Sequence, residues 1–136
     1  MNLHEKILIF HNKPDDYKEM FHILEEHFLI LFYSTDRETF LQLFTSEEPD
    51  LVILDLAHSE SLQIIPLAEK NPVILISDTE ESVIEGLNLG AEDYIIKPVN
   101  MSLLLHKIKK SLQKKKLKEE NPDYVIKEEE LKNIIE

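Results

Sequence analysis

The stretch Leu51-Val52-Ile53-Leu54-Asp55 decides the fold. Its four apolar residues in a row suit a strand that is covered on both faces, as in a parallel sheet. A half-exposed strand would alternate apolar and polar residues instead. Asp55 then stands at the carboxyl end of this strand, and ligands of open parallel sheets bind beyond that end. We therefore expect Asp55 to lie in a functional site.

Strand-like and helix-like segments alternate on both sides of this stretch. The other predicted strands are Lys6–Phe10, Leu29–Tyr33, Pro72–Ile76 and Asp93–Ile96. The first predicted helix begins at Pro14, with Met20, Phe21, Leu24 and Phe28 inward, and the second follows the cap Asp36, with Phe40, Leu41, Leu43 and Phe44 inward. A short third helix begins near Ser59 and is interrupted by Pro66, and the fourth runs from Glu80 to Leu89 and is closed by Gly90. The last helix begins at Met101, with Leu104, Leu105, Ile108 and Leu112 inward. Such alternation implies right-handed crossovers between parallel strands. The predicted fold is α/β: a flavodoxin-like, doubly wound, five-stranded parallel sheet of order 2-1-3-4-5 with helices on both faces.

Composition limits the classes of function. The 136 residues, 43% of them apolar, suit one domain, which we place at residues 1–120. Asn121-Pro122-Asp123 breaks the last helix, and residues 121–136 read as a linker or the start of a truncated output segment. A formal charge of −12 opposes binding to nucleic acid or anionic lipid. Two glycines are too few for a glycine-rich phosphate loop.

The same sequence gives an expectation about location. It contains no cysteine, so disulfides and thiolate zinc sites are excluded. The first residues lead directly into a strand without a leader-peptide pattern, and no apolar stretch reaches the length of a membrane span. The six histidines show no metal-ligand spacing. We expect a cytoplasmic protein that does not interact with the membrane.

Polar residues follow three of the predicted strands: Asp55, Ser77 and Lys97. They are about twenty residues apart, which leaves room for a crossover helix between them. The segments that contain them, Pro49–Leu56, Pro72–Ser77 and Gly90–Pro98, closely resemble receiver domains of two-component response regulators, over residues 6 to about 118. The resemblance implies that Asp55 accepts a phosphoryl group, that the Ser77 hydroxyl turns toward it, and that Lys97 pairs with its oxygens. It also implies a switching role for Tyr94 and a cis peptide bond between Lys97 and Pro98.

The sequence departs from this family at the metal position. Receivers usually carry adjacent acidic residues after the first strand, whereas His11-Asn12, followed by Lys13, stands here. The remaining candidate ligands of Mg²⁺ are Asp55, the side chain of Asn12 and the backbone of Ala57, which predict a weak site or none. We expect Lys13 and Lys97 to neutralise the pocket through an ion pair in the unphosphorylated state.

Two further positions near the site carry expectations. His11 reads as a hydrogen-bonded structural histidine rather than a ligand. Asp78 follows Ser77 where receivers carry a small residue, and its carboxylate either repels phosphate or approaches the metal. Ser77, Asp78 and Thr79 compete for the cap of the following helix.

The resemblance implies a phosphorelay role rather than an enzyme. Asp55 would receive a phosphoryl group from a histidine kinase or phosphotransfer protein and alter contacts with a downstream protein or output domain. A pseudo-receiver that binds partners without phosphorylation remains an alternative, favoured by His11, Asn12 and Asp78. An aspartate-nucleophile phosphohydrolase is a third reading, although Ala57 stands where such enzymes carry a second aspartate. Dimerisation through the last helix is a further option.

Overall fold

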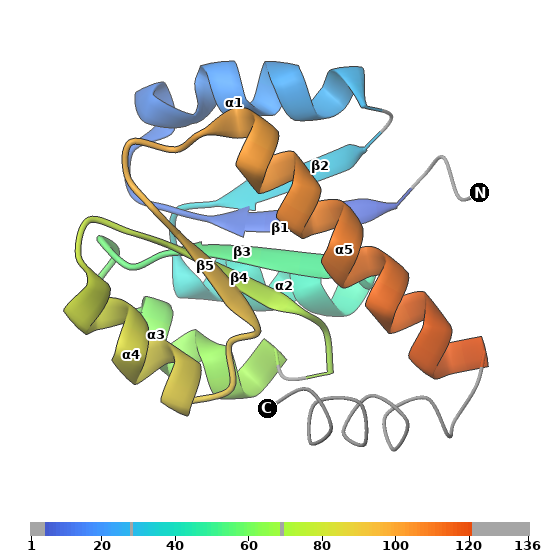
Figure 1. Ribbon diagram of the computed structural model, residues 1–136. Helices are drawn as coiled ribbons and strands as arrows, with labels where there is room; N and C mark the ends of the chain where they lie inside the picture. Colours follow the sequence, from blue (N-terminus) through green and yellow to red (C-terminus); the bar gives the residue numbers. More distant parts are fainter. Residues whose placement is uncertain (1–4, 28, 69, 121–136) are drawn as a thin grey trace, which may run out of the picture.

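Strands and helices alternate along the whole described chain. The computed structural model describes residues 5–27, 29–68 and 70–120 (Figure 1). The strands are β1 (Lys6–Phe10), β2 (Ile30–Ser34), β3 (Leu51–Asp55), β4 (Val73–Ser77) and β5 (Asp93–Ile96). The helices are α1 (Pro14–Glu26), α2 (Arg37–Glu47), α3 (Ser61–Ile64), the 3₁₀ helix η1 (Ile65–Ala68), α4 (Glu80–Asn88) and α5 (Met101–Glu120). Every predicted element is present, and most of the predicted ends differ by only one or two residues.

Within the described residues the strands form one five-stranded sheet of order β2-β1-β3-β4-β5, and every pair is parallel. The predicted fold class and strand order are confirmed. In the register of the sheet, Asp55 lies beside Ile76 of β4, and Ser77 lies beside Ile96 of β5. Asp55, Ser77 and Lys97 therefore lie at the same edge of the sheet, as expected for the carboxyl ends of parallel strands.

The sheet is covered on both faces. Ile7, Ile9 and Ile53 point to one face and pack with residues of α1 and α5, such as Leu24 and Ile108. On the other face, strand residues pack with α2, α3 and η1; this cluster includes Leu8, Phe10, Leu54, Phe40 and Ile65. Residues Leu51 to Leu54 have no exposed surface, which explains why both alternating positions of β3 are apolar.

The segment after β3 forms a single α-helical turn followed by the 3₁₀ helix. The helix was predicted near Ser59 but begins at Ser61, because the preceding residues form turns in which the amide of His58 bonds to the carbonyl of Asp55 and that of Ser61 to the carbonyl of His58. Pro66 lies within η1, where its missing amide donor interrupts the α-helical bonding pattern. The predicted interruption at Pro66 is thus confirmed.

Other local predictions are also confirmed. Asp36 caps α2 by accepting a hydrogen bond from the amide of Thr39. Gly90 follows α4 with a φ of 118°, a conformation that favours glycine. The Lys97–Pro98 peptide bond is cis.

Some predictions fall outside the described residues. Phe28, predicted on the inner face of the first helix, is one such residue. The break at Asn121-Pro122-Asp123 and the predicted linker or output segment at residues 121–136 also lie outside the described part of the chain. No helix in the described ranges is long and apolar enough to cross a membrane.

Candidate functional site

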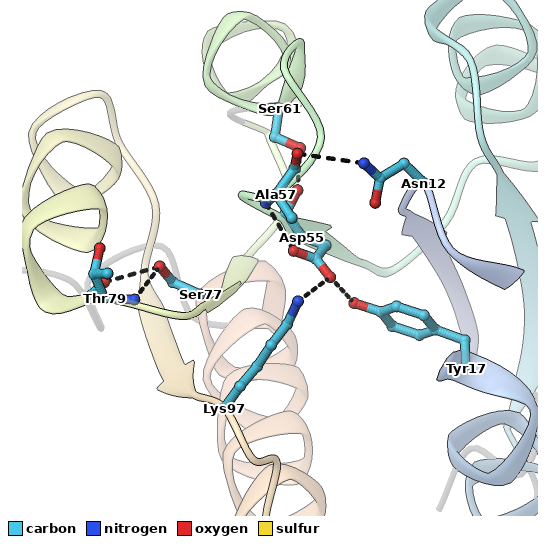
Figure 2. A network of polar contacts seen from close by, with 8 residues as sticks. All are labelled: Asn12, Tyr17, Asp55, Ala57, Ser61, Ser77, Thr79 and Lys97. Carbon is cyan, nitrogen blue, oxygen red and sulfur yellow. Dashed lines mark hydrogen bonds and ion pairs between the residues drawn. The ribbon is translucent and has the colours of Figure 1, made fainter. Parts of the chain in front are cut away.

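Asp55 lies at the end of β3, and its side chain is almost completely buried, with 2% of the residue exposed. A buried carboxylate needs hydrogen bonds or a counter-charge to offset the loss of water. Asp55 has both. Its Oδ1 accepts a 2.8 Å bond from the amide of Ala57, and its Oδ2 pairs with Lys97 and with a hydroxyl group (Figure 2). The carboxylate is therefore held in one orientation.

Lys97 follows β5 and reaches across the end of β4 to Asp55. Its Nζ lies 2.9 Å from Oδ2 of Asp55. The lysine side chain is 27% exposed, so its ammonium group keeps some contact with solvent while it neutralises the buried carboxylate. This ion pair is the one expected from the sequence, although Lys13 has no part in it: Lys13 is exposed and forms no ion pair with Asp55 in the described structure.

The sequence reasoning missed Tyr17. Its hydroxyl donates a 2.6 Å hydrogen bond to Oδ2 of Asp55, the oxygen that also pairs with Lys97 (Figure 2). Burial of the ring and the bond to Asp55 raise the pKa of Tyr17, so the phenol stays protonated and acts only as a donor. Helical spacing could have indicated this residue, because Tyr17 shares the inner face of α1 with Met20 and Leu24 and lies nearest the strand ends.

Ser77 lies near Asp55 in the sheet but does not bond to it. Its Oγ donates to the carbonyl of Thr79 at 2.8 Å and accepts from the amide of Thr79 at 3.1 Å. Figure 2 shows the hydroxyl turned away from Asp55, toward the start of α4. Thr79 caps that helix by accepting from the amide of Ser82, which decides the competition among Ser77, Asp78 and Thr79. The structure thus brings the Lys97 side chain into contact with Asp55, whereas the hydroxyl of Ser77 bonds to Thr79 instead.

The predicted magnesium ligands fit a cation poorly. The side-chain amide of Asn12 donates a 3.3 Å bond to the carbonyl of Ala57, so these two predicted ligands bond to each other. Each oxygen of Asp55 already accepts from protein donors. No group of three or more His, Cys, Asp or Glu side chains that could hold a metal occurs in residues 5–27, 29–68 and 70–120. Mg²⁺ prefers several hard, anionic oxygens, and Asp55 is the one predicted ligand that supplies a carboxylate.

His11 is buried in an aromatic group rather than hydrogen-bonded. Neither ring nitrogen has a hydrogen-bond partner among the described residues, so the expectation of a hydrogen-bonded histidine is wrong. The ring stacks on Tyr17 with centroids 4.4 Å apart and lies 6.1 Å from the ring of Tyr33. Burial lowers the pKa of His11, which favours the neutral form. His11 therefore serves as a packing surface for Tyr17.

Asp78 and Tyr94 lie at the periphery of the site. Asp78 is exposed, and its charge is one of the causes that raise the pKa of Tyr17. Tyr94 lies in β5 and is partly buried against the core cluster that contains Phe40. The Nζ of Lys107 lies 5.3 Å from the centroid of the Tyr94 ring and pairs with Asp93 at 2.8 Å, which connects the predicted switch residue to α5.

A cavity of about 330 Å³ opens beside the site, between α1 and the segment that follows β5. Tyr17 and Lys97, the two side chains bonded to Oδ2 of Asp55, both line it. Its other residues combine two carboxylates with an apolar wall: Asp16, Glu19, Met20, Ile76, Pro98, Val99 and Met101. A molecule bound in this cavity would touch both side chains that hold the carboxylate.

Comparison with known proteins gives one consistent family. Residues 7–109 match the response regulator receiver domain. The chain is 32% identical over 135 residues to the regulatory protein VanR of Enterococcus faecium, an alignment that covers 90% of this chain and 58% of VanR. It is 34% identical over 122 residues to the probable transcriptional regulator ycf27 of Porphyridium aerugineum, covering 81% of this chain and 49% of that protein.

Solved structures agree with the sequence matches. A two-component response regulator from Clostridium difficile superposes with a TM-score of 0.74 and 25% identity, covering 80% of this chain and 96% of that one. NtrX from Brucella abortus superposes with a TM-score of 0.80 and 25% identity, over 88% of this chain and 28% of NtrX. The chain spans about half the length of VanR and ycf27, which continue beyond the matched region.

Proposed function

Because this chain belongs to the family of response regulator receiver domains, we propose that it accepts a phosphoryl group on Asp55 and signals through changed protein contacts. The observation that carries the proposal is the ion pair between the buried carboxylate of Asp55 and Lys97, at 2.9 Å. A buried carboxylate at the carboxyl end of a central strand, with a cation beside it, suits nucleophilic attack on phosphorus.

The transfer reaction needs a nucleophile and positive groups that stabilise the developing charge. An oxygen of Asp55 attacks phosphorus, a P–O bond forms, and the P–N bond to the donor histidine breaks. The imidazole leaves with the electron pair and takes a proton from water. Lys97 then follows the phosphoryl oxygens, while the amide of Ala57 keeps the carboxyl group oriented through its 2.8 Å bond to Oδ1.

A change in Ser77 would transmit phosphorylation to the surface. In the unphosphorylated structure the Ser77 hydroxyl bonds to Thr79, which caps α4. We propose that the phosphoryl group competes for this hydroxyl, loosens its hold on the start of α4 and shifts Tyr94 between two positions. Exposed apolar side chains on α4 and α5, Ile84, Leu87 and Leu103, give this surface the means to bind a downstream protein or output domain, or a second copy.

The phosphoryl donor in this proposal is a histidine kinase or phosphotransfer protein. The cavity lined by Tyr17 and Lys97 supports this, because a donor seated there would lie next to Asp55. The relatives VanR and ycf27 are named as regulators, which is compatible with an output function elsewhere in a longer protein. We further propose that the protein is cytoplasmic. We do not propose that this domain binds nucleic acid.

Incubation with phosphoramidate tests the proposal, since its P–N bond reproduces the bond of a phosphohistidine. Intact-mass spectrometry of wild-type protein should show one added phosphoryl group that is lost on treatment with hydroxylamine, which cleaves acyl phosphates. Asp55→Asn should show none. A label of the same size on both proteins would exclude Asp55 as the acceptor.

A pseudo-receiver is the second candidate, and one observation favours it. The bond between the amide of Asn12 and the carbonyl of Ala57 joins two of the predicted magnesium ligands, and His11 adds no anionic oxygen. Such a domain would bind its partner without phosphorylation. The phosphoramidate experiment separates the two candidates, because a pseudo-receiver would acquire no label.

We propose no step that uses a metal, and no turnover of a small-molecule substrate. Receiver domains commonly bind Mg²⁺ at the phosphorylation site, but the residues of this site fit the ion poorly. Ala57 offers backbone atoms alone where a phosphohydrolase would use a second aspartate, so nothing supports the hydrolase alternative.

A further inference from the structure

We propose that Tyr17 restrains the acceptor: its hydrogen bond to Oδ2 of Asp55 stabilises the unphosphorylated carboxylate and slows its reaction with phosphoryl donors. The inference rests on the proposed function of Asp55 as the acceptor. It adds a residue of α1 to the reaction as a regulator of its rate. No feature of the sequence pattern had assigned a role to this side chain.

The donors around Asp55 are unevenly distributed between its two oxygens. An ionised carboxylate has about four lone-pair positions, two on each oxygen. Oδ2 accepts from Tyr17 at 2.6 Å and from Lys97 at 2.9 Å, whereas Oδ1 accepts from the amide of Ala57 at 2.8 Å. Oδ2 is therefore saturated by its two donors. Attack on phosphorus through Oδ2 requires that at least one of them withdraw.

Tyr17 and Lys97 differ in their ability to withdraw. Tyr17 is 3% exposed, and its ring packs against the stacked ring of His11 and the ring of Phe21, with centroids 4.4 and 6.0 Å away. A packed aromatic ring has two side-chain torsions and little room to turn. Lys97 has a long flexible chain that is 27% exposed, and its charge attracts the incoming phosphoryl oxygens. Lys97 can follow the phosphoryl group, and Tyr17 cannot.

The chemistry of phosphorylation weakens the Tyr17 bond wherever the new P–O bond forms. Formation of the acyl phosphate removes the negative charge from the carboxylate. If Oδ2 is the attacking oxygen, it becomes a bridging oxygen and a poor acceptor; if Oδ1 attacks, Oδ2 becomes a neutral carbonyl oxygen. Hydrogen bonds to charged groups are roughly twice as strong as those between neutral groups. The hydroxyl of Tyr17 therefore stabilises the reactant more than the product.

The variant Tyr17→Phe removes the hydroxyl and keeps the ring that packs on His11. Its initial rate of labelling by acetyl phosphate should exceed that of wild type by about tenfold or more, from the usual strength of a hydrogen bond to a charged group. Tyr33→Phe is the matched control, since Tyr33 lies in the same aromatic group, 5.2 Å from Phe21, but forms no hydrogen bond with Asp55 in the described part of the chain. Its rate should equal that of wild type.

A second measurement separates restraint from general loosening of the site. After removal of acetyl phosphate, loss of the label from Tyr17→Phe should proceed within about twofold of the wild-type rate, because the lost bond acted on the unphosphorylated state. A merely structural role would accelerate hydrolysis as well, by admitting water. Tyr17→Leu, which also lacks the hydroxyl, should be labelled faster than wild type too, and circular dichroism checks that each variant is folded.

The outcomes distinguish this inference from the proposed function. Faster labelling of Tyr17→Phe than of wild type supports the restraint. Equal or slower labelling overturns the restraint but leaves Asp55 as the acceptor, provided that Asp55→Asn is not labelled. If neither wild type nor the Tyr17 variants acquire label, both the proposed function and the restraint are wrong.

Discussion

Lys97 joins the ends of two strands that are not neighbours: its ammonium group, after β5, lies 2.9 Å from the carboxylate of Asp55 at the end of β3. The intervening strand β4 ends in Ser77, whose hydroxyl bonds to Thr79 instead. The ion pair thus bridges the end of β4 and, in the proposed function, gives Asp55 a cation that can move to a phosphoryl group.

Removal of this cation should slow phosphorylation. In Lys97→Ala the charge that develops on the phosphoryl oxygens loses its nearest positive group, and we expect the labelling rate with acetyl phosphate to fall about a hundredfold. Lys97→Arg, which keeps a positive charge, should retain more activity than the alanine variant. Equal rates in wild type and Lys97→Ala would contradict a role of the ion pair in the reaction.

A carboxylate at position 12 should strengthen magnesium binding. Asn12 is exposed at the mouth of the site, and Asn12→Asp supplies the hard, anionic oxygen that the site lacks. We expect the dissociation constant for Mg²⁺, measured by calorimetry, to decrease by about tenfold. The control is Asn88→Asp, the same isosteric change on the exposed face of α4. A similar effect of both variants would indicate nonspecific attraction by the added charge.

Ser61 links α3 to the end of β3. Its buried hydroxyl donates a 2.5 Å bond to the backbone carbonyl of Asp55, so Ser61→Ala leaves that carbonyl without this donor. The free energy of unfolding in urea should fall by about 1 to 2 kcal/mol. Ser59→Ala, an exposed serine of the same loop, should change it by less than about 0.5 kcal/mol. Equal losses would mean that the buried bond contributes nothing specific.

The pKa of Glu5 predicts a dependence of stability on pH. Partial burial, followed by repulsion from Asp50, raises this pKa above its ordinary value of 4.5. Between the ordinary and the raised value the folded protein binds more protons than the unfolded chain, so this carboxyl group lowers stability as pH rises through that window. Glu5→Gln should therefore stabilise the protein at neutral pH, by about 0.5 kcal/mol for a partly exposed group.

Urea titrations of this variant at neutral pH and near pH 4 provide the measurement. The gain from Glu5→Gln should disappear at the lower pH, where the carboxyl group of the wild type is protonated. Glu85→Gln, which removes the same charge from an exposed position on α4, serves as the control. A gain from Glu5→Gln that persists unchanged at low pH would rule out ionisation as its cause.

The fold was predictable from sequence because most elements have a clear pattern, the short helical segment after β3 being the exception. Leu51 to Leu54 are buried on both faces of the sheet, and Gly90 ends α4 with a positive φ, as their residue types indicate. The edge alignment of Asp55, Ser77 and Lys97 follows from parallel strands alone. What the strand pattern cannot specify is where each side chain turns at that edge.

Side-chain orientation is the part of the site that the sequence did not specify. The bond of the Ser77 hydroxyl to Thr79 depends on the loop before α4, and the stacking of His11 on Tyr17 depends on packing between β1 and α1. The first is a bond within one loop and the second is a contact between two elements, and the strand and helix patterns specify neither. Tyr17 was missed for the same reason: its position on the inner face of α1 was readable, but its 2.6 Å bond to Asp55 was not.

Chemical mapping of the phosphorylated residue tests the central claim most directly. Wild-type protein is incubated with acetyl phosphate, reduced with borohydride, which converts an aspartyl phosphate to homoserine, and digested for peptide mass spectrometry. We predict homoserine at position 55 and nowhere else in the chain. Homoserine at another aspartate, or an unmodified Asp55 in protein that has acquired a label, would contradict the account.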